Sequence, residues 1–475
     1  MKNIYSIILF CFLLIGISSL FSSCNDESFS TDSSHLLTFS QDTLSFDTVF
    51  TSIGSATAQI KVYNPNKQLL KISSIVLANA VNSGFKVNVD GEKGTHFSDV
   101  EIQGEDSMHI FVEVKINPLD RDNPILIKDS LVFTTNGVQQ DIKLLAYGQD
   151  VIILRGKNIQ RDTTFTSIRP ILVYDSLRIN DGAKLQCEAG TRLYFHDKAS
   201  LLVHGTVEAQ GTLGAPVLFR GDRLDNMFTD LPYDRVPGQW GGVRLYSSSY
   251  QNRFDYVDIY SGEYGILCDS SAVDKEKLLL TNSILHNVEG DALSMTSCKA
   301  VIANSQITNA GNNCVNLLGG DYTFTHCTLA NFFSWSIRSG VALSYANYKG
   351  KVNYPIKTSF YNCLITGSSS DEIGGSKPDN DAISFDYYFS HSLINSVEET
   401  ASERIVNITW EKERNFRYIG KDDYKYDFRP DSICKAKDIG DIEIARNYPY
   451  DLNGRSRLQD DKPDAGCYEW ISGDK

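Results

Sequence analysis

One short stretch of the chain holds the side chains that acid-base chemistry requires. His286, Glu289 and Asp291 place an imidazole and two carboxylates within six residues. Two carboxylates can serve as a general acid and a general base, and carboxylate oxygens are also ligands for Ca²⁺. The alternative is a solvated turn around Gly290, since carboxylates beside glycine are common in turns. These three residues are therefore the candidate catalytic residues, with a calcium site and a simple turn as the competing interpretations.

A second candidate site is aromatic. Segment 331–356 contains six aromatic residues, among them Trp335, Tyr345 and Tyr348. Exposed aromatic rings offer large apolar faces on which sugar rings can stack, and they predict a polysaccharide-binding surface here. The alternative is a small satellite core in which the same rings cover the flank of the protein.

The structure that must position both sites is built on a four-residue sequence repeat, or phrase, that occurs six times. The first residue is polar or Tyr, the fourth is aliphatic, and the starts lie 26, 22, 22, 36 and 29 residues apart. The six phrases begin at Tyr256, Asn282, Asn304, His326, Asn362 and His391. Recurrence at such an interval indicates a solenoid, and the short β-branched segments favour strands. We expect the fourth residues to point into the coil and Asn282, Asn304 and Asn362 to form a hydrogen-bonded ladder at a corner.

Other segments carry a family resemblance. Residues 190–195, 205–212, 216–219 and 239–243 resemble the first turns of right-handed parallel β-helix proteins. Residues 455–457 and 463–469 resemble the terminal signature of Gram-negative cell-surface lipoproteins with that fold. The resemblance implies a right-handed parallel β-helix over residues 150–440 and a C-terminal cap segment over 441–475.

The region before the coil shows a different pattern. Ile110, Val112, Val114 and Ile116 recur with the two-residue period of a half-buried strand, and turn sequences such as Asn136-Gly137 separate several such strands. Together with the phrase at residues 44–64, this resembles bacterial Ig-like modules. We therefore expect an all-β protein, with an Ig-like β-sandwich over residues 36–149 ahead of the β-helix.

The N-terminus resembles an export signal. Lys2 is followed by an apolar run and by Ser22-Ser23-Cys24, which predicts a signal peptide over residues 1–23. The end of this run resembles a bacterial lipobox, which implies lipidation of Cys24, a tether over residues 24–35 and attachment to the outer membrane, with the protein at the cell surface.

Composition narrows the classes of partner and cofactor. The net charge of −14 argues against nucleic acid as a partner. The cysteines form no close CxxC pair, so we expect neither a metal site nor another cofactor, apart from the calcium alternative above. The cysteines after Cys24 are expected to be buried free thiols.

Three functions remain open at this level. The first is a non-catalytic surface lipoprotein that displays the β-helix for binding glycans or other surface partners. The second is a polysaccharide lyase or glycoside hydrolase on the β-helix, and the third is a structural protein of the cell surface.

Overall fold

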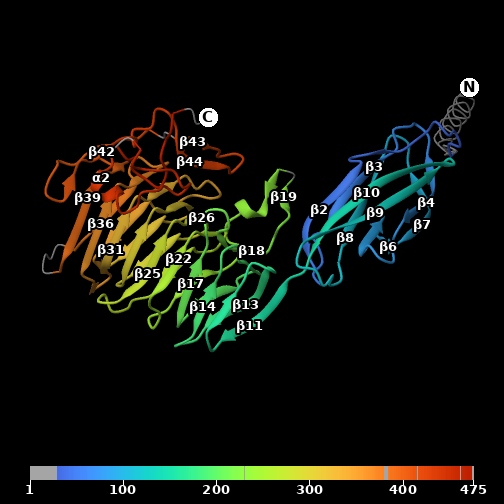
Figure 1. Cartoon of the computed structure of the whole chain (residues 1–475). Coiled ribbons are helices and arrows are strands. Elements are labelled where there is room, and N and C mark those ends of the chain that lie inside the picture. The colour runs from blue at the N-terminus through green and yellow to red at the C-terminus, as the bar shows by residue number, and fades with distance from the viewer. Residues whose placement is uncertain (1–28, 229, 379–382, 414–415, 460–461, 473–475) are drawn as a thin grey trace, which may run out of the picture. The chain divides into compact units, whose positions relative to one another are not determined.

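The computed structural model describes residues 29–228, 230–378, 383–413, 416–459 and 462–472 (Figure 1). The chain divides into two compact units between Gln149 and Asp150. The regular structure of the described residues is almost entirely β-strand. The predicted signal peptide and Cys24 lie outside these residues.

Alternating apolar and polar residues build the first unit. In β8 (Ser107–Val114), Ile110, Val112 and Val114 are buried, whereas His109, Phe111 and Glu113 face solvent. One sheet has the order β1 (Thr38–Phe39), β3 (Ala58–Tyr63), β8, β5 (Phe85–Val89), β6 (Glu92–Gly94). The other has the order β2 (Thr43–Phe50), β10 (Val138–Gln149), β9 (Ile125–Thr135), β4 (Leu70–Leu77), β7 (His96–Ile102). All neighbours pair antiparallel except β2 and β10, and the inward residues of both sheets share one hydrophobic core.

The second unit is built from parallel strands that return to the same three ladders in a fixed order. After each turn the chain pairs with the turn before it, as expected of a β-helix solenoid. Ladder A contains β12 (Thr163–Phe165), β14 (Lys184–Cys187), β17 (Thr206–Gln210), β22 (Asn252–Asp255), β25 (Glu276–Thr281), β28 (Lys299–Ala303), β31 (Gly320–Thr325), β36 (Ile356–Tyr361), β39 (Phe385–Ser390) and β41 (Ile405–Val406). Ladder B contains β15 (Arg192–Phe195), β18 (Val217–Gly221), β23 (Val257–Tyr260), β26 (Ile284–Val288), β29 (Gln306–Ala310), β32 (Thr328–Asn331), β37 (Leu364–Gly367), β40 (Leu393–Ile394) and β42 (Thr409–Trp410).

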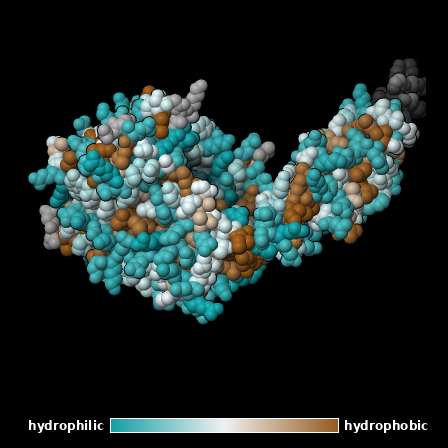
Figure 2. Space-filling view, viewed as in Figure 1, coloured by the Kyte–Doolittle hydropathy of each residue, from teal (hydrophilic) through white to brown (hydrophobic). Residues whose placement is uncertain are grey.

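Ladder C follows ladder B in every turn except the last two. It contains β16 (Ser200–Val203), β21 (Gly242–Leu245), β24 (Ile266–Cys268), β27 (Leu293–Thr296), β30 (Val315–Leu318), β33 (Leu343–Ala346) and β38 (Ile373–Ser376). The first turns are simpler, because β11 (Ile152–Ile159) pairs along β13 (Ile171–Ile179), which contacts β15 with one half and β16 with the other. On the face seen in Figure 2, hydrophilic residues cover most of the surface of this unit, while its apolar residues fill the coil.

The six repeated phrases occupy one corner and the strand of ladder B that follows it. Their first residues all have a positive φ, between 47° and 51°, which explains the recurrence of Asn at a left-handed position. Their fourth residues stack in register and are buried: Ile259, Leu285, Ile307, Leu329, Ile365 and Ile394. The expectation that these residues point into the coil is confirmed.

In most phrases the side chain of the second residue forms a hydrogen bond to the backbone at the same corner. Ser283 and Ser305 donate hydrogen bonds to the carbonyl oxygens of Thr281 and Ala303, at 2.6 and 2.8 Å. Cys327 and Cys363 make the equivalent contact with their thiols, at 3.4 and 3.3 Å. The expectation of free thiols holds for the described cysteines, which are all buried and unpaired.

A C-terminal segment covers ladder B. From β43 (Phe416–Ile419) and β44 (Tyr426–Pro430), through α2 (Ile442–Ala445), to Tyr468, it buries the outward side chains of ladder B in a second core. Leu364 and Leu393 from the coil meet Phe416, Phe428 and Leu452 from this segment. The last strand of the coil ends at Trp410, so position 440, predicted as the end of the coil, lies within the covering segment.

Candidate functional site

A cleft of about 630 Å³ lies where the covering segment ends and the outer face of ladder B becomes accessible. Three strands form its floor, and two excursions of the chain form its walls. Its lining includes Asp234, Arg235, Asp258, Tyr260, His286, Asn287, Gln306, Thr308, Asn309, Tyr418, Tyr424, Lys425, Tyr426, Asp427, Arg429, Asn453 and Tyr468. Figure 1 shows the β19 hairpin and the β43–β44 hairpin on the same side of the coil as β26.

The floor follows from strand alternation. Since Ile259, Leu285 and Ile307 point inward, their neighbours on β23, β26 and β29 must point outward. These outward side chains form two rows, Asp258 with Ile284 and Gln306, and Tyr260 with His286 and Thr308. The floor therefore presents the carboxylate of Asp258 and the imidazole of His286, whereas Gln306 and Thr308 beside them are buried and bonded to each other at 3.1 Å.

His286 is held by two residues of the neighbouring turn. Its Nε2 lies 3.2 Å from Oδ1 of Asp258, and its ring stacks on Tyr260 with centroids 4.8 Å apart. The side chains of His286 and Asp258 are 25% and 30% exposed, so both remain accessible from the cleft.

Tyr260 forms the base of the floor. Burial raises the pKa of its phenol well above the usual range; the positive charge of Arg220 opposes this shift, and the charges of Asp258 and Asp234 add to it. The buried guanidinium of Arg220 donates to the Tyr260 hydroxyl at 3.2 Å and to the carbonyl oxygen of Arg223 at 2.7 Å. Arg220 thus connects the floor with the first wall.

The first wall is the excursion that contains β19 (Asn226–Phe228), β20 (Leu231–Pro232) and the short helix η1 (Tyr233–Arg235). The guanidinium of Arg223 packs over the Tyr233 ring at 4.0 Å, and Gln239 donates to the carbonyl oxygen of Val236 at 2.8 Å. From this wall Asp234 contributes a buried carboxylate oxygen that has no hydrogen-bond partner among the described residues.

The second wall is the hairpin of β43 and β44 with its connecting loop. Tyr418 is 49% exposed and donates from its hydroxyl to Asp423 at 2.9 Å. Tyr424 stacks against Trp335 with ring centroids 3.9 Å apart and an angle of 15° between the planes. The tyrosines of this wall and the carboxylate of Asp234 line the same cleft.

The three predicted catalytic residues do not lie together in one site. His286 lies on the cleft floor, Glu289 is exposed beyond the end of β26, and Asp291 is buried before β27. Both oxygens of Asp291 accept hydrogen bonds from the next turn, from Asn312, Asn313 and Asn316, at 2.7 to 3.0 Å. The structure therefore gives Asp291 a corner role and pairs His286 with Asp258, not with Glu289 or Asp291.

The predicted aromatic platforms also separate. Tyr345 is 6% exposed and packs inside the coil against Phe385, with centroids 5.4 Å apart. This burial leaves no free face for a sugar and places Tyr345 in the core of the coil itself, which corrects both its interpretation as a platform and the alternative of a satellite core on the flank. Tyr348 begins the small hairpin of β34 (Tyr348–Lys349) and β35 (Val352–Asn353), and its hydroxyl accepts from Ser376 at 3.2 Å. Only Trp335 reaches the cleft, through Tyr424.

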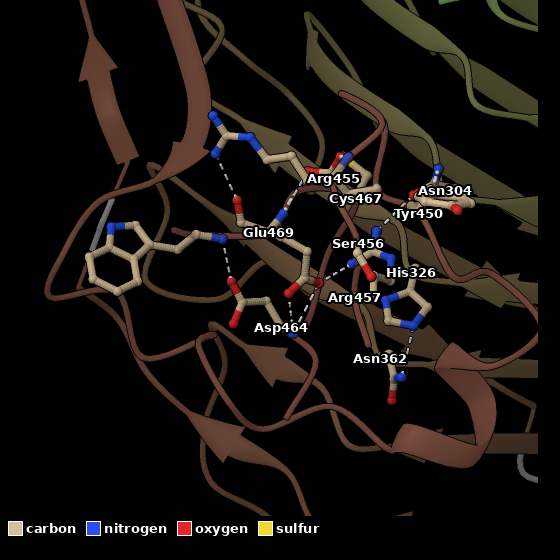
Figure 3. Close-up of polar contacts among 12 residues, drawn as sticks. Asn304, His326, Asn362, Tyr450, Arg455, Ser456, Arg457, Asp464, Cys467 and Glu469 are labelled. Carbon is tan, nitrogen blue, oxygen red and sulfur yellow. Dashed lines mark hydrogen bonds and ion pairs between the residues drawn. The ribbon is translucent and has the colours of Figure 1, made fainter. Parts of the chain in front are cut away.

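The predicted asparagine ladder is present in part. Asn304 donates to Oδ1 of Asn282 at 2.7 Å, and Asn362 lies 3.0 Å from Nε2 of His326. Between these two pairs the covering segment inserts Arg457, which binds Oδ1 of Asn304 at 2.7 Å and forms an ion pair with Glu469 (Figure 3). The corner therefore anchors the segment that carries the second wall of the cleft.

Two features are absent from the described residues. None of their His, Cys, Asp and Glu side chains gather in a group of three that could hold a metal ion. None of the helices in the same residues has the length and apolar character needed to cross a membrane.

Several cleft residues were not predicted from the sequence. Asp258 is the third residue of the first repeated phrase, and third residues are outward by alternation, so the repeat carried a usable signal. Tyr418, Tyr424 and Tyr426 belong to an aromatic cluster at 416–428 that a search for aromatic density would find. Their approach to His286 depends on the path of the covering segment, which no local pattern encodes.

Comparison with known proteins adds little to this geometry. No family model matches the chain, and no curated protein gives a significant match. One similar solved structure is a family 123 glycoside hydrolase from Clostridium perfringens, 8% identical, covering 24% of this chain and 25% of that chain with a TM-score of 0.17. Another is the VesB protease of Vibrio cholerae, 11% identical, covering 24% and 31% with a TM-score of 0.17. The chain thus spans about a quarter to a third of these proteins, and neither similarity bears on its function.

Proposed function

We propose that this protein is an outer-membrane lipoprotein of the cell surface that binds a neutral glycan in the cleft over β23, β26 and β29, without transforming it. The observation that carries the proposal is the composition of the cleft, whose lining combines the half-exposed ring of Tyr418 with the accessible carboxylate of Asp258 and imidazole of His286. Sugars present both C–H faces and hydroxyl groups, and a site with aromatic faces and convergent polar groups complements both.

Charge supports a neutral ligand over an acidic one. Arg235, Lys425 and Arg429 line the cleft together with Asp234, Asp258 and Asp427, and Arg429 is already paired with Asp427. With a chain charge of −14, an uronic or sulfated polymer would meet overall repulsion.

The remaining parts of the chain fit display at a surface. Lipidation at Cys24 would anchor the protein through acyl chains, and the unit before Gln149 would act as an Ig-like spacer. A right-handed β-helix would then carry the cleft. These assignments rest on the sequence resemblances and on the two mainly antiparallel sheets of the first unit.

The test is a binding panel with a matched control. The detergent-solubilised full chain is passed over immobilised neutral glucan, mannan and galactan, and over one uronic polymer. Tyr418→Ala removes a half-exposed ring from the cleft wall, and Tyr147→Ala removes a ring of similar exposure from the first unit. We expect retention on a neutral polymer that Tyr418→Ala weakens by about 1 to 3 kcal/mol and Tyr147→Ala leaves unchanged.

A second candidate function is glycoside hydrolysis, and one specific observation favours it. Asp258 on the floor and Asp234 on the first wall both line the cleft, and an oxygen of Asp234 is buried without a partner among the described residues. Two carboxylates that flank a bound sugar are what hydrolysis requires. Release of reducing ends by the wild-type chain, lost in Asp258→Asn and in Asp234→Asn, would establish hydrolysis in place of simple binding.

A further inference from the structure

We propose that the cleft is a closed bowl that receives the end of a glycan chain and excludes the middle of a long polymer. This inference rests on the proposed glycan-binding function and adds the part of the glycan that is recognised. Its evidence is the boundary of the cleft, which the chain closes on four sides.

Two sides are the walls already described. Along the coil axis, the excursion with η1 lies toward the first turns, since it leaves the coil between β18 and β21. The β43–β44 hairpin lies toward the last turns and joins the core over Leu364 and Leu393. A polymer aligned with the coil axis would meet a wall in each direction.

The third side closes the ends of the floor strands. Gln239 bonds to the carbonyl oxygen of Ser261, immediately after β23, so the chain that follows η1 lies at the C-terminal ends of these strands. The loop before β44 lies at the corresponding end of the next strand, because Ser334, shortly after β32, donates to the carbonyl oxygen of Lys421 at 3.3 Å. The two walls meet here, where Arg235 donates to the carbonyl oxygen of Asp423 at 3.0 Å.

The fourth side closes the beginnings of the same strands. Asn304, two residues before β29, donates to the carbonyl oxygen of Tyr450 at 3.2 Å. The loop that follows contributes Asn453 to the cleft lining and is held by the buried Asp451, which accepts from the backbone N–H groups of Asn453 and Arg455 at 2.9 and 2.7 Å. A polymer aligned with the floor strands therefore meets Arg235 at one end and this loop at the other.

The consequence concerns the geometry of the ligand. An internal segment of a linear polymer must enter and leave its site, so it needs a groove open at two ends. A chain end needs one opening, and the bowl leaves only its mouth. Its volume of about 630 Å³ lies within the range of about 300–1,000 Å³ that is typical of sites for one small ligand.

The test compares one polymer at two chain lengths. Glucan, mannan and galactan are each prepared intact and partly fragmented, and binding of the full-length protein is measured at equal polymer mass. If chain ends are recognised, binding per unit mass rises in proportion to the number of ends. Arg235→Ala removes the bridge between the walls and should bring the ratio of fragmented to intact binding toward unity. Arg244→Ala, an arginine paired with Asp269 away from the cleft, should leave that ratio unchanged.

Each alternative outcome is decisive. Equal binding of intact and fragmented polymer by the wild-type protein would overturn recognition of chain ends and leave glycan binding intact. An end-dependent ratio that Arg235→Ala does not change would show that the bridge does not close the bowl, and would overturn the proposal in this form. Failure to bind any of the three polymers in either preparation would overturn the proposed function, and this inference with it.

Discussion

The indole of Trp335 lies flat on the ring of Tyr424, with centroids 3.9 Å apart and planes 15° from parallel. Tyr424 has a positive φ of 53°, which is uncommon for a bulky side chain, so its position depends on such support. Trp335 leaves the coil after β32, whereas Tyr424 belongs to the covering segment. The contact therefore fixes a wall of the cleft to the coil and gives Trp335 a positioning role.

Replacement of Trp335 tests this role. Trp335→Ala should weaken retention on a neutral polysaccharide by about 1 kcal/mol, because an aromatic pair contributes about 0.5–1.5 kcal/mol beyond its buried area. Trp335→Phe keeps a flat ring and should restore most of the retention. Affinity measurement with a thermal melt separates the two roles, since a lower melting temperature with unchanged retention would mark Trp335 as a purely structural residue.

Tyr345, in contrast to Trp335, should contribute to stability and not to glycan retention. Its ring packs in the coil core, so Tyr345→Ala should lower the free energy of unfolding by about 3–5 kcal/mol, as large core truncations do. Chemical denaturation measures the loss, and Tyr345→Phe serves as the conservative control. Weakened glycan retention in a Tyr345→Phe protein of normal stability would contradict the buried role assigned here.

The repeat was the most informative part of the sequence. The spacing of Ile307, Leu329 and Ile365 was sufficient to predict their common ladder, because a buried position in a coil must be filled at every turn. The Asn residues that open three of the phrases were predicted as corner residues, and their positive φ values supply the physical reason. Regular features of this kind are encoded locally and repeatedly.

The cleft was less predictable because it depends on a segment that returns from far along the chain. His286 was singled out for its nearness to Glu289 and Asp291, but a corner of the coil lies between them, and the partner of His286 is Asp258, one turn earlier. Sequence distance is a poor guide in a solenoid, since residues about one turn apart lie closer than residues a few positions apart across a corner. The covering segment adds Tyr418 and Tyr424, whose contacts no periodic pattern specifies.

The buried ladder can be tested with a charge. Leu329→Asp would place an unpaired carboxylate between Ile307 and Ile365, so we expect a loss of several kcal/mol in the free energy of unfolding. Leu329→Met keeps the volume and should cost less than about 1.5 kcal/mol. Denaturant titration of both variants gives the comparison, and a Leu329→Asp protein of ordinary stability would refute the inward orientation.

The predicted anchor is tested by cell fractionation. Cys24→Ala removes the thiol that lipidation requires, so the protein should leave the membrane fraction and keep its fold and its melting temperature. Ser22→Ala provides a control substitution in the same region. Continued fractionation of Cys24→Ala with the outer membrane would exclude lipid attachment at this residue.

The covering segment should lose stability as the pH rises. Burial raises the pKa of Glu469 from 4.5 to about 7, an effect opposed by Arg457, and burial likewise raises the pKa of Asp464 from 3.8 to about 6. Between the unfolded and the folded pKa of each carboxyl group, the folded state binds more protons than the unfolded state. The free energy of unfolding therefore falls as the pH rises through this window.

The size and location of this effect make it measurable. For Glu469, a pKa change from 4.5 to about 7 corresponds to roughly 3 kcal/mol, since one pKa unit is about 1.4 kcal/mol. Hydrogen exchange of the backbone N–H groups at residues 451–459 and 462–469, measured below and above the window, should show easier opening at the higher pH. Glu469→Gln keeps a hydrogen-bond acceptor for Arg457 but cannot ionise, so it should flatten the pH dependence, whereas Glu443→Gln, on the exposed face of α2, should not. If both variants follow the wild-type profile, the pH dependence arises elsewhere, because Glu469 is the group whose ionisation the first variant removes.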